Sequence, residues 1–261
     1  MGPRRACRTL RVNSRPRQQI LTLIAIALTF GSGATDVASF TRLGEVFTSV
    51  MTGNIVLWGL AVARGSLSLA SHTAVAIAGY IVGVAGGTWI AHGFKVSGGS
   101  ASGGSAAEGG VGRASVLPAH VSWALFAELI LLAGFTVGWE VSGARPAGWA
   151  EFALLAVLAA AMGVQASAVN EMGMANVSTT FLTGTLTGLV SSLVSPGQDT
   201  PHGLRRFGVL IGLAAGAGLC GLLVATAAAA VPVLPLAALV TALVLSAVPL
   251  RNGEEPAAPG R

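Results

Sequence analysis

Long apolar stretches separated by short polar breaks run along almost the whole chain. Apolar stretches of about 20 residues are typical of transmembrane helices, whereas a membrane β-barrel needs segments of about 10 residues with alternating polarity. The pattern therefore predicts an all-α polytopic membrane helix bundle of about eight spans, with six to eight crossing. The candidate spans are about 19–40, 46–63, 68–93, 119–139, 146–171, 177–194, 203–231 and 232–250.

Composition supports the membrane class. Of the 261 residues, 53% are hydrophobic and only 10% are charged, against about 25% charged residues in soluble domains. The chain lacks the polar surface that would cover a globule in water. The second and sixth candidate spans are the shortest and most polar, so the sequence leaves open whether they cross fully or re-enter.

Basic residues set the expected orientation. Six of the fifteen crowd the first 17 positions without interleaved aromatic residues, which favours a cytoplasmic anchor over a nucleic-acid-binding segment. Eight crossings from a cytoplasmic N-terminus place 12 basic residues inside and 3 outside, the bias that the positive-inside rule requires. We therefore expect a cell (inner) membrane protein with both termini cytoplasmic and the segment 94–117 outside.

The first span has an alternative interpretation. A basic region, the apolar core "ILTLIAIALTF", and the small residues Ser32 and Ala34 also fit a cleaved signal peptide. The internal repeat described next needs this helix, so we favour a retained span. The expected organisation is a basic tail (1–18), a first membrane half (19–93), a Gly/Ser-rich flexible linker (94–117), a fourth helix with the second half (118–250), and a polar tail (251–261).

A polar, glycine-containing phrase occurs twice in the apolar sequence. "SVMTGN" (49–54) and "TTFLTGT" (179–185) each place a hydroxyl residue three positions before Thr-Gly, at an offset of 131. The segments 36–44 and 165–173 align at an offset of 129, and the pair Gly79/Gly83 matches Gly212/Gly216 at 133. These features predict an internal repeat. Four spans per half is an even number, so the two repeats are expected to be parallel, related by an axis along the membrane normal.

Two segments carry a family resemblance. "TDVASFTRLGEVFTSVMTGNIVLWGLAVA" and "MGVQASAVNEMGMANVSTTFLTGTLTGL" resemble the two signature regions of the YoaK family of small bacterial integral membrane proteins. The resemblance implies a membrane protein and brings no established activity, so function has to be argued from the residues.

Hydroxyl side chains gather on one face of the sixth span. Thr180, Thr183 and Thr187 share that face with Gly184. Such a face either packs against a neighbouring helix or lines a polar path. The second span keeps its own set of matching residues, which comprises Thr52, Gly53 and Asn54.

Intramembrane carboxylates are costly and mark functional sites by default. Glu128 is the deepest ionisable residue, at the middle of the fourth span. It must be neutral, paired or hydrated there, so it can carry a proton or is bonded to a polar neighbour. Asp36 lies nearer the outer end of the first span, and Gln165 replaces it in the repeat. These three residues are candidates for a substrate or ion pathway, together with the polar residues of the second and sixth spans: Thr52, Asn54, Thr180, Thr183 and Thr187.

Other polar positions suggest structural roles. Arg42 and Glu171 occupy matching repeat positions with opposite charge, which predicts a salt bridge at the outer mouth. Helix packing is expected at Gly53, Gly79, Gly83, Gly184, Gly212 and Gly216.

Catalytic and metal-binding patterns are missing from the sequence. The four histidines fall near span ends without ligand spacing, and the two cysteines give no disulfide framework. We therefore expect no enzyme activity, no cofactor and no bound metal. The expected partners are the lipid bilayer and a small-molecule or ion substrate, with no nucleic acid, and a homo-oligomer stays open. The leading hypothesis is a small secondary transporter or channel, coupled to protons or cations. The alternative is a non-transporting scaffold or subunit of a membrane complex.

Overall fold

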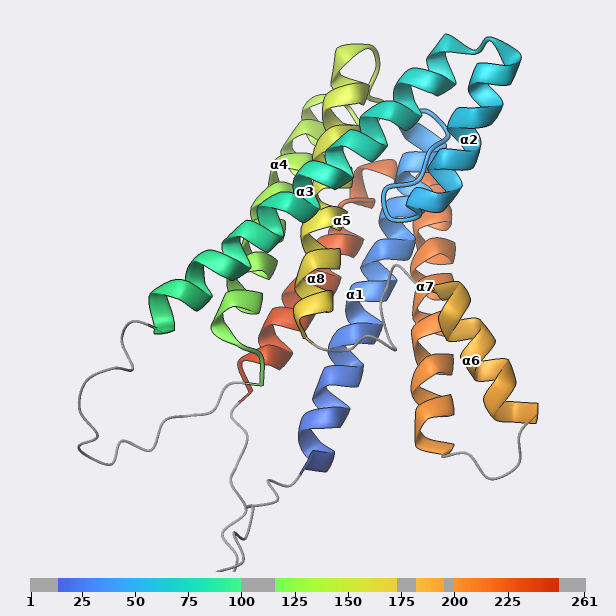
Figure 1. Cartoon of the computed structure of the whole chain (residues 1–261). Coiled ribbons are helices and arrows are strands. Elements are labelled where there is room, and N and C mark those ends of the chain that lie inside the picture. Colours follow the sequence, from blue (N-terminus) through green and yellow to red (C-terminus); the bar gives the residue numbers. More distant parts are fainter. Residues whose placement is uncertain (1–13, 100–115, 173–181, 195–199, 249–261) are drawn as a thin grey trace, which may run out of the picture.

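The computed structural model describes residues 14–99, 116–172, 182–194 and 200–248, and regular structure within them is entirely helical. Thr180 lies outside the described residues. The elements in chain order (Figure 1) are α1 (Ser14–Arg42), α2 (Met51–Arg64), α3 (Leu67–Gly99), α4 (Ala119–Val141), α5 (Trp149–Glu171), α6 (Leu182–Val194), α7 (Thr200–Thr226), the 3₁₀ turn η1 (Ala228–Ala230) and α8 (Val233–Ser246).

Six of the described helices are long and apolar enough to cross a bilayer: α1, α3, α4, α5, α7 and, with η1, α8. The polytopic helix bundle is thus confirmed, at the lower end of the expected range of spans. α2 has 14 residues and α6 has 13. At 1.5 Å per residue each is about 20 Å long, too short for a hydrocarbon core about 30 Å thick.

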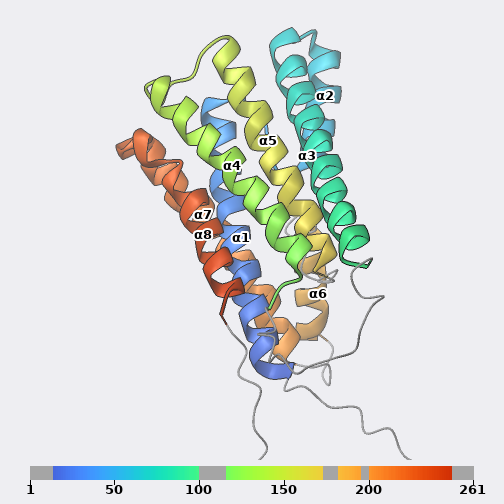
Figure 2. The ribbon, with the colours of Figure 1, turned by 90° about the vertical axis from the view of Figure 1, so that its left-hand side faces the viewer.

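The two short helices lie at opposite ends of the bundle. Figure 1 shows α2 beside the upper end of α3 and α6 beside the lower part of α7, and the turned view in Figure 2 agrees. α1 runs upward from the lower end, whereas α5 runs downward. Three long helices, an odd number, precede α5, so the two halves enter from opposite sides. The predicted parallel orientation, which assumed four crossings per half, is therefore wrong.

The segment between α3 and α4 is also corrected. α3 continues to Gly99, inside the region 94–117 predicted as a flexible linker. Val116 and Leu117, just before α4, are 1% and 2% exposed and belong to the hydrophobic core. The end of α3 and the start of α4 lie at the same end of the bundle as the start of α1 (Figure 1). The prediction that this segment lies on the opposite side from the N-terminus fails for the same reason as the parallel repeat.

Glycines bring two pairs of helices into backbone contact. A Cβ on Gly79 would lie 2.7 Å from the carbonyl oxygen of Ala156, and one on Gly83 would meet that of Ala160, so α3 lies directly on α5. The same relation joins α7 to α1. A Cβ on Gly212 would lie 3.1 Å from the oxygen of Ile26, and one on Gly216 would meet that of Phe30.

The contacts are reciprocal. Gly163 on α5 lies against the backbone of Tyr80 and Val84, and Gly33 on α1 lies against that of Leu213 and Ala217. Each α3–α5 contact therefore has an α7–α1 counterpart, at offsets of 133 residues for α3 and α7 and 130 for α1 and α5. The structure places Gly79, Gly83, Gly212 and Gly216, four of the six glycines predicted to pack helices, in these contacts.

The remaining long helices complete the core. α4 packs on α5 and α8 packs on α1, with α4 and α8 also in contact. Phe135 and Trp139 of α4 are 1% and 0% exposed, and the indole Nε1 of Trp139 donates to the carbonyl of Ala228, 2.9 Å away. This hydrogen bond fixes the end of α4 to the turn that precedes α8.

Candidate functional site

A polar network crosses the core where α1, α4 and α5 meet. Ser32 Oγ donates to Gln165 Oε1 (2.8 Å), and Gln165 Nε2 donates to Glu128 Oε1 (3.0 Å). Glu128 is 0% exposed, Ser32 is 1% and Gln165 is 3%. The second carboxylate oxygen of Glu128, Oε2, is buried and has no hydrogen-bond partner among the described residues. The structure thus brings together two sequence candidates, Glu128 and Gln165.

Ser32 was not a site candidate in the sequence, although a signal was present. Thr29, Ser32, Asp36 and Ser39 recur every three or four residues along α1, which places them on one face of the helix. All four are buried. A polar stripe in an otherwise apolar helix predicts a face turned toward the bundle interior, and it would have pointed to Ser32.

Asp36 is enclosed by the loop that leads into α2. Its Oδ1 accepts the backbone N–H groups of Thr48 and Ser49, both at 2.8 Å, and the Thr48 hydroxyl at 3.1 Å. Its Oδ2 accepts the Ser49 hydroxyl at 2.6 Å. Asp36 therefore anchors the loop before α2, and both of its carboxylate oxygens have partners.

Asn54 holds the same loop from the other side. Its Oδ1 accepts the N–H of Phe47 (2.9 Å) and its Nδ2 donates to the carbonyl of Phe47 (2.6 Å). The side chain is 0% exposed. The polar residues of "SVMTGN" thus stabilise the loop. Ser49 bonds to Asp36, and the Asn54 side chain bonds to the N–H and the carbonyl of Phe47.

The remaining hydroxyl candidates lie on the outside of the described bundle. Thr52 on α2 and Thr183 and Thr187 on α6 are exposed, and the Thr187 hydroxyl donates to the carbonyl of Thr183 (2.9 Å). A Cβ on Gly184 would meet no described atom within 4 Å, and the nearest atoms to one on Gly53 belong to Phe47 and Val50 of the adjacent loop. Neither position has another described helix as its nearest neighbour, unlike the other four.

The predicted salt bridge between Arg42 and Glu171 is wrong. Arg42 Nη2 donates to the carbonyl of Val224 (3.2 Å), at the end of α1. Glu171 ends α5 at the opposite end of the bundle (Figure 1) and lies 3.7 Å from His120. The two residues are far apart because the halves run in opposite directions.

Two histidine–glutamate pairs flank the network. His72 Nε2 on α3 lies 3.2 Å from Glu151 Oε1 at the start of α5, and His120 on α4 meets Glu171 at its end. No group of three or more metal-ligating side chains occurs in the part of the chain that the structure describes.

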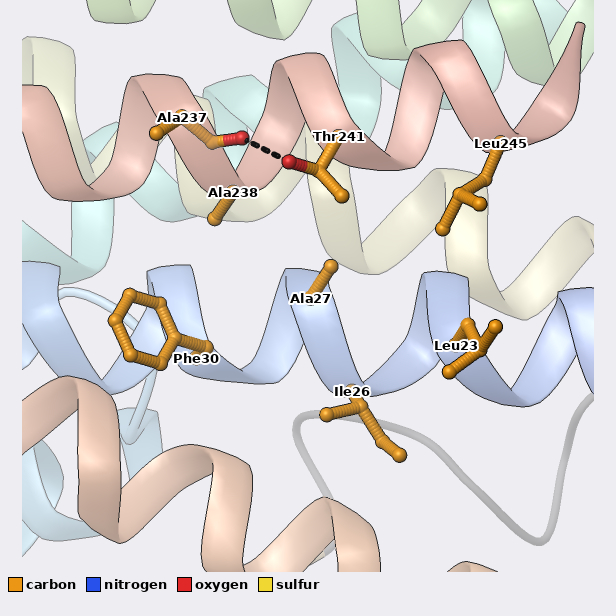
Figure 3. Close-up of a pocket in the computed structure, with 8 residues that line it drawn as sticks. All are labelled: Leu23, Ile26, Ala27, Phe30, Ala237, Ala238, Thr241 and Leu245. Atoms are coloured by element: carbon orange, nitrogen blue, oxygen red, sulfur yellow. Dashed lines mark hydrogen bonds between the residues drawn. The ribbon is translucent and has the colours of Figure 1, made fainter.

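An apolar groove of about 380 Å³ runs between α1 and α8 (Figure 3). Its single hydroxyl, that of Thr241, donates to the carbonyl of Ala237 at 2.7 Å, so the groove offers no free polar group to a solute. The lining residues are Leu23, Ile26, Ala27, Phe30, Ala237, Ala238, Thr241 and Leu245.

Comparison with protein families gives one match, described as a protein of unknown function (DUF1275), over residues 24–246. That range runs from the first long helix to the last. The chain belongs to the DUF1275 family. The YoaK relative described next confirms the resemblance noted in the sequence.

A curated relative agrees with this assignment. The chain is 30% identical over 179 residues to the UPF0700 transmembrane protein YoaK of Bacillus subtilis (strain 168), covering 68% of this chain and 67% of the relative. No solved structure matches. Membership of the family and the six long apolar helices together establish a multi-pass membrane protein in a lipid bilayer.

Proposed function

We propose that the chain is a small secondary transporter for a small solute, without enzyme activity, coupled to protons or cations through Glu128. The observation that carries this proposal is the Ser32–Gln165–Glu128 network. It ends on a fully buried carboxyl group with one oxygen unpartnered among the described residues. A carboxyl group in this setting has to be protonated or has to accept a cation, since an isolated charge is costly to bury.

The arrangement of the two halves supports the same function. We infer that they are inverted repeats, because the α3–α5 and α7–α1 contacts correspond at constant offsets. The contact of Thr35 Oγ1 with Met162 Sδ (3.3 Å) mirrors that of Ser32 with Gln165 at an offset of 130. Inverted repeats with interrupted helices and a site at the repeat interface are a common plan of secondary transporters.

Transport also needs a second conformation, because Glu128 is 0% exposed in this one. Inverted repeats supply it in principle, since each half can adopt the arrangement of the other and so open the site to the opposite side. The helices α2 and α6, at opposite ends of the bundle, are the two that are too short to span the membrane.

We further propose an inner-membrane location with both termini cytoplasmic. With six crossings the inside receives the N-terminal arginines, Lys95, Arg113, Arg205, Arg206, Arg251 and Arg261. Only Arg42, Arg64 and Arg145 fall outside. This 12-to-3 division is the same as for eight crossings, so the positive-inside rule alone does not separate the two topologies.

Cysteine labelling separates them. In a chain with Cys7 and Cys220 replaced by Ser, Arg64→Cys and Gly93→Cys place single thiols at exposed positions near the ends of α2 and α3. Six crossings put position 64 outside and position 93 inside, whereas eight reverse both. A membrane-impermeant maleimide applied to intact cells should therefore label position 64 only.

The function itself is tested in proteoliposomes. Vesicles loaded with a pH-sensitive dye are offered amino acids, sugars, nucleobases and inorganic ions in turn, and solute-dependent proton entry is recorded. Glu128→Gln should abolish that entry, while the matched variant Glu140→Gln, at the exposed end of the same helix, should keep it. Solute uptake coupled to a gradient with equal efficiency in both variants would refute the role of Glu128.

The scaffold alternative is supported by the tight glycine contacts and the sealed interior. In that role the exposed Thr183, Gly184 and Thr187 of α6 would pack against a helix of a second copy or of another subunit. Absence of any flux across the panel, together with a stable co-purifying complex, would favour this function.

A further inference from the structure

Two adjacent arginines, Arg205 and Arg206, lie near the start of α7, beside the short helix α6. Nη1 of Arg206 donates to the carbonyl of Gly188 on α6, 2.8 Å away. A Cβ at position 188 would lie 2.9 Å from the same guanidinium group, so Arg206 rests directly on the backbone of α6. A guanidinium group is always charged and carries five N–H donors. One neutral carbonyl therefore leaves most of its donors and all of its charge unmatched.

Arg205 has no hydrogen bond or ion pair among the described residues. Its Nε is buried without a partner, whereas the side chain as a whole is only partly buried, so the terminal nitrogens of the guanidinium group stay accessible. Arg205 lies one turn before Val209, which is 0% exposed and packs on Ala25 of α1. It therefore shares the face of α7 that is turned toward α1.

The positive charges of Arg205 and Arg206 repel each other. The ion pairs in the described part of the chain join histidines to glutamates and leave both arginines out. A buried, unpartnered donor is costly, and so is a desolvated charge without a counter-charge. The pair thus has the chemistry of an anion site, and a phosphate fits it well, because the parallel N–H donors of a guanidinium group match two phosphate oxygens.

The depth of the pair in the membrane narrows the kind of phosphate. The span Gly203–Thr226 has 24 residues and is about 36 Å long, against a hydrocarbon core about 30 Å thick. Arg205 and Arg206 are its third and fourth residues, so they lie at the level of the lipid headgroups. Leu204 and Phe207, on either side of the pair in the sequence, are 76% and 51% exposed. These apolar side chains favour a phosphate that carries acyl chains over one that is free in water.

We propose that Arg205 and Arg206 bind the phosphate group of an anionic phospholipid, at the end of the bundle where α1 and α7 start (Figure 1). The phosphate accepts hydrogen bonds from the accessible nitrogens of both side chains, and its charge offsets their mutual repulsion. The acyl chains lie against Leu204 and Phe207. Basic pockets between membrane helices are known to bind lipid headgroups. This proposal does not depend on the transporter function.

Binding is measured on the full chain in neutral detergent micelles. Phosphatidylglycerol, phosphatidylcholine or inorganic phosphate is titrated in, and the unfolding temperature is followed, because a ligand that binds only the folded protein raises it. Phosphatidylglycerol should give a saturable rise. Phosphatidylcholine, whose phosphate is balanced by choline, and inorganic phosphate, which has no acyl chains, should give much smaller rises. An equal rise with phosphatidylcholine would indicate a general effect of lipid, and an equal rise with inorganic phosphate a site for free anions. Either result would overturn the proposal.

Arg205→Gln is the test variant, because it breaks no hydrogen bond among the described residues. Without added lipid its unfolding temperature should match that of the unmodified chain. The phosphatidylglycerol concentration that gives half of the maximal rise should increase about fivefold, which corresponds to about 1 kcal/mol for one arginine at a membrane surface. Arg205→Lys keeps the charge without the paired donors, so its value should fall between the two.

The matched control is Arg17→Gln. Arg17 is exposed at the start of α1, at the same end of the bundle, so the variant removes the same charge from the same face of the membrane. It should leave the half-maximal concentration unchanged. A shift in Arg17→Gln as large as that in Arg205→Gln would mean that lipid responds only to overall charge. That result, or no shift in either Arg205 variant, would refute a specific site.

Discussion

Asp36 and Glu128 are both buried carboxylates in membrane helices, yet their surroundings differ. Asp36 accepts four hydrogen bonds from Thr48 and Ser49, which use both of its oxygens. Glu128 accepts one, from Gln165, and its other oxygen has no partner among the described residues. Burial alone therefore does not separate a structural carboxylate from a functional candidate. The number of hydrogen-bond partners separates the two. A carboxylate with both oxygens bonded stabilises the groups around it, whereas one with an unpartnered oxygen can still bind a proton or cation.

The strongest test of this contrast is Asp36→Ala. The change leaves two backbone N–H groups and two hydroxyls without their acceptor, at about 1–3 kcal/mol for each group that stays buried and unsatisfied. We expect the free energy of unfolding, measured by SDS titration in mixed micelles, to fall by about 3 kcal/mol or more. Asp36→Asn keeps one acceptor oxygen and should lose roughly half as much. Equal losses in the two variants would mean that the side-chain volume, and not the hydrogen bonds, is what matters.

Asn54→Leu tests whether the loop of residues 43–50, between α1 and α2, depends on more than Asp36. The leucine has a similar volume but forms neither of the two bonds to Phe47. A loss of about 2 kcal/mol is expected in the same titration. A loss below that of Ser32→Ala, described next, would contradict the assignment of Asn54 as a structural anchor.

Ser32→Ala removes one bond at the far end of the Glu128 network. Hydrogen bonds between membrane helices contribute about 0.6 kcal/mol on average, and a loss of that order is expected. If the loss approached that of Asp36→Ala, the network would be a structural element comparable with the loop of residues 43–50.

Glu128→Gln should have the smallest effect on stability, below about 0.5 kcal/mol. Glutamine keeps an acceptor for Gln165, and its amide replaces an oxygen that has no described partner. A loss of more than about 2 kcal/mol, the scale set by a buried group left unsatisfied, would show that Glu128 has a structural role like that of Asp36.

The sequence predicted the class of fold and many of the contacts, because hydropathy and small-residue spacing report directly on burial in a bilayer. Glu128 and the glycines of α3 and α7 were identified in this way, and Gln165 was identified by its match to Asp36 in the repeat. The error lay in the second and sixth spans. Their apolar content suggested crossings, but α2 and α6 have only 14 and 13 residues. Two miscounted crossings reversed the relation between the halves.

That reversal also explains the Arg42–Glu171 error, and the alignment contained a second, separate one. Arg42 and Glu171 matched in sequence yet lie at opposite ends. The alignment at an offset of 129 paired Asp36 with Gln165, whereas the helix contacts follow an offset of 130 and pair Thr35 with Gln165. The register of α1 against α5 follows from their matching contacts at Gly33 and Gly163, which were not used in the alignment.

The pairing of α1 with α7 and α8 has a consequence for biogenesis. α1 is made first, but the helices that cover it end at Thr226 and Ser246. At about 5–20 residues per second, about 10–40 s of synthesis separate α1 from its partners. During that interval the backbone of α1 at Ile26, Phe30 and Gly33 lacks the helix that packs on it, so the newly made helix has fewer partners than in the complete bundle. Chains arrested after α5 should therefore be degraded faster in pulse-chase experiments than complete chains, and a membrane insertase or chaperone would find its target on α1.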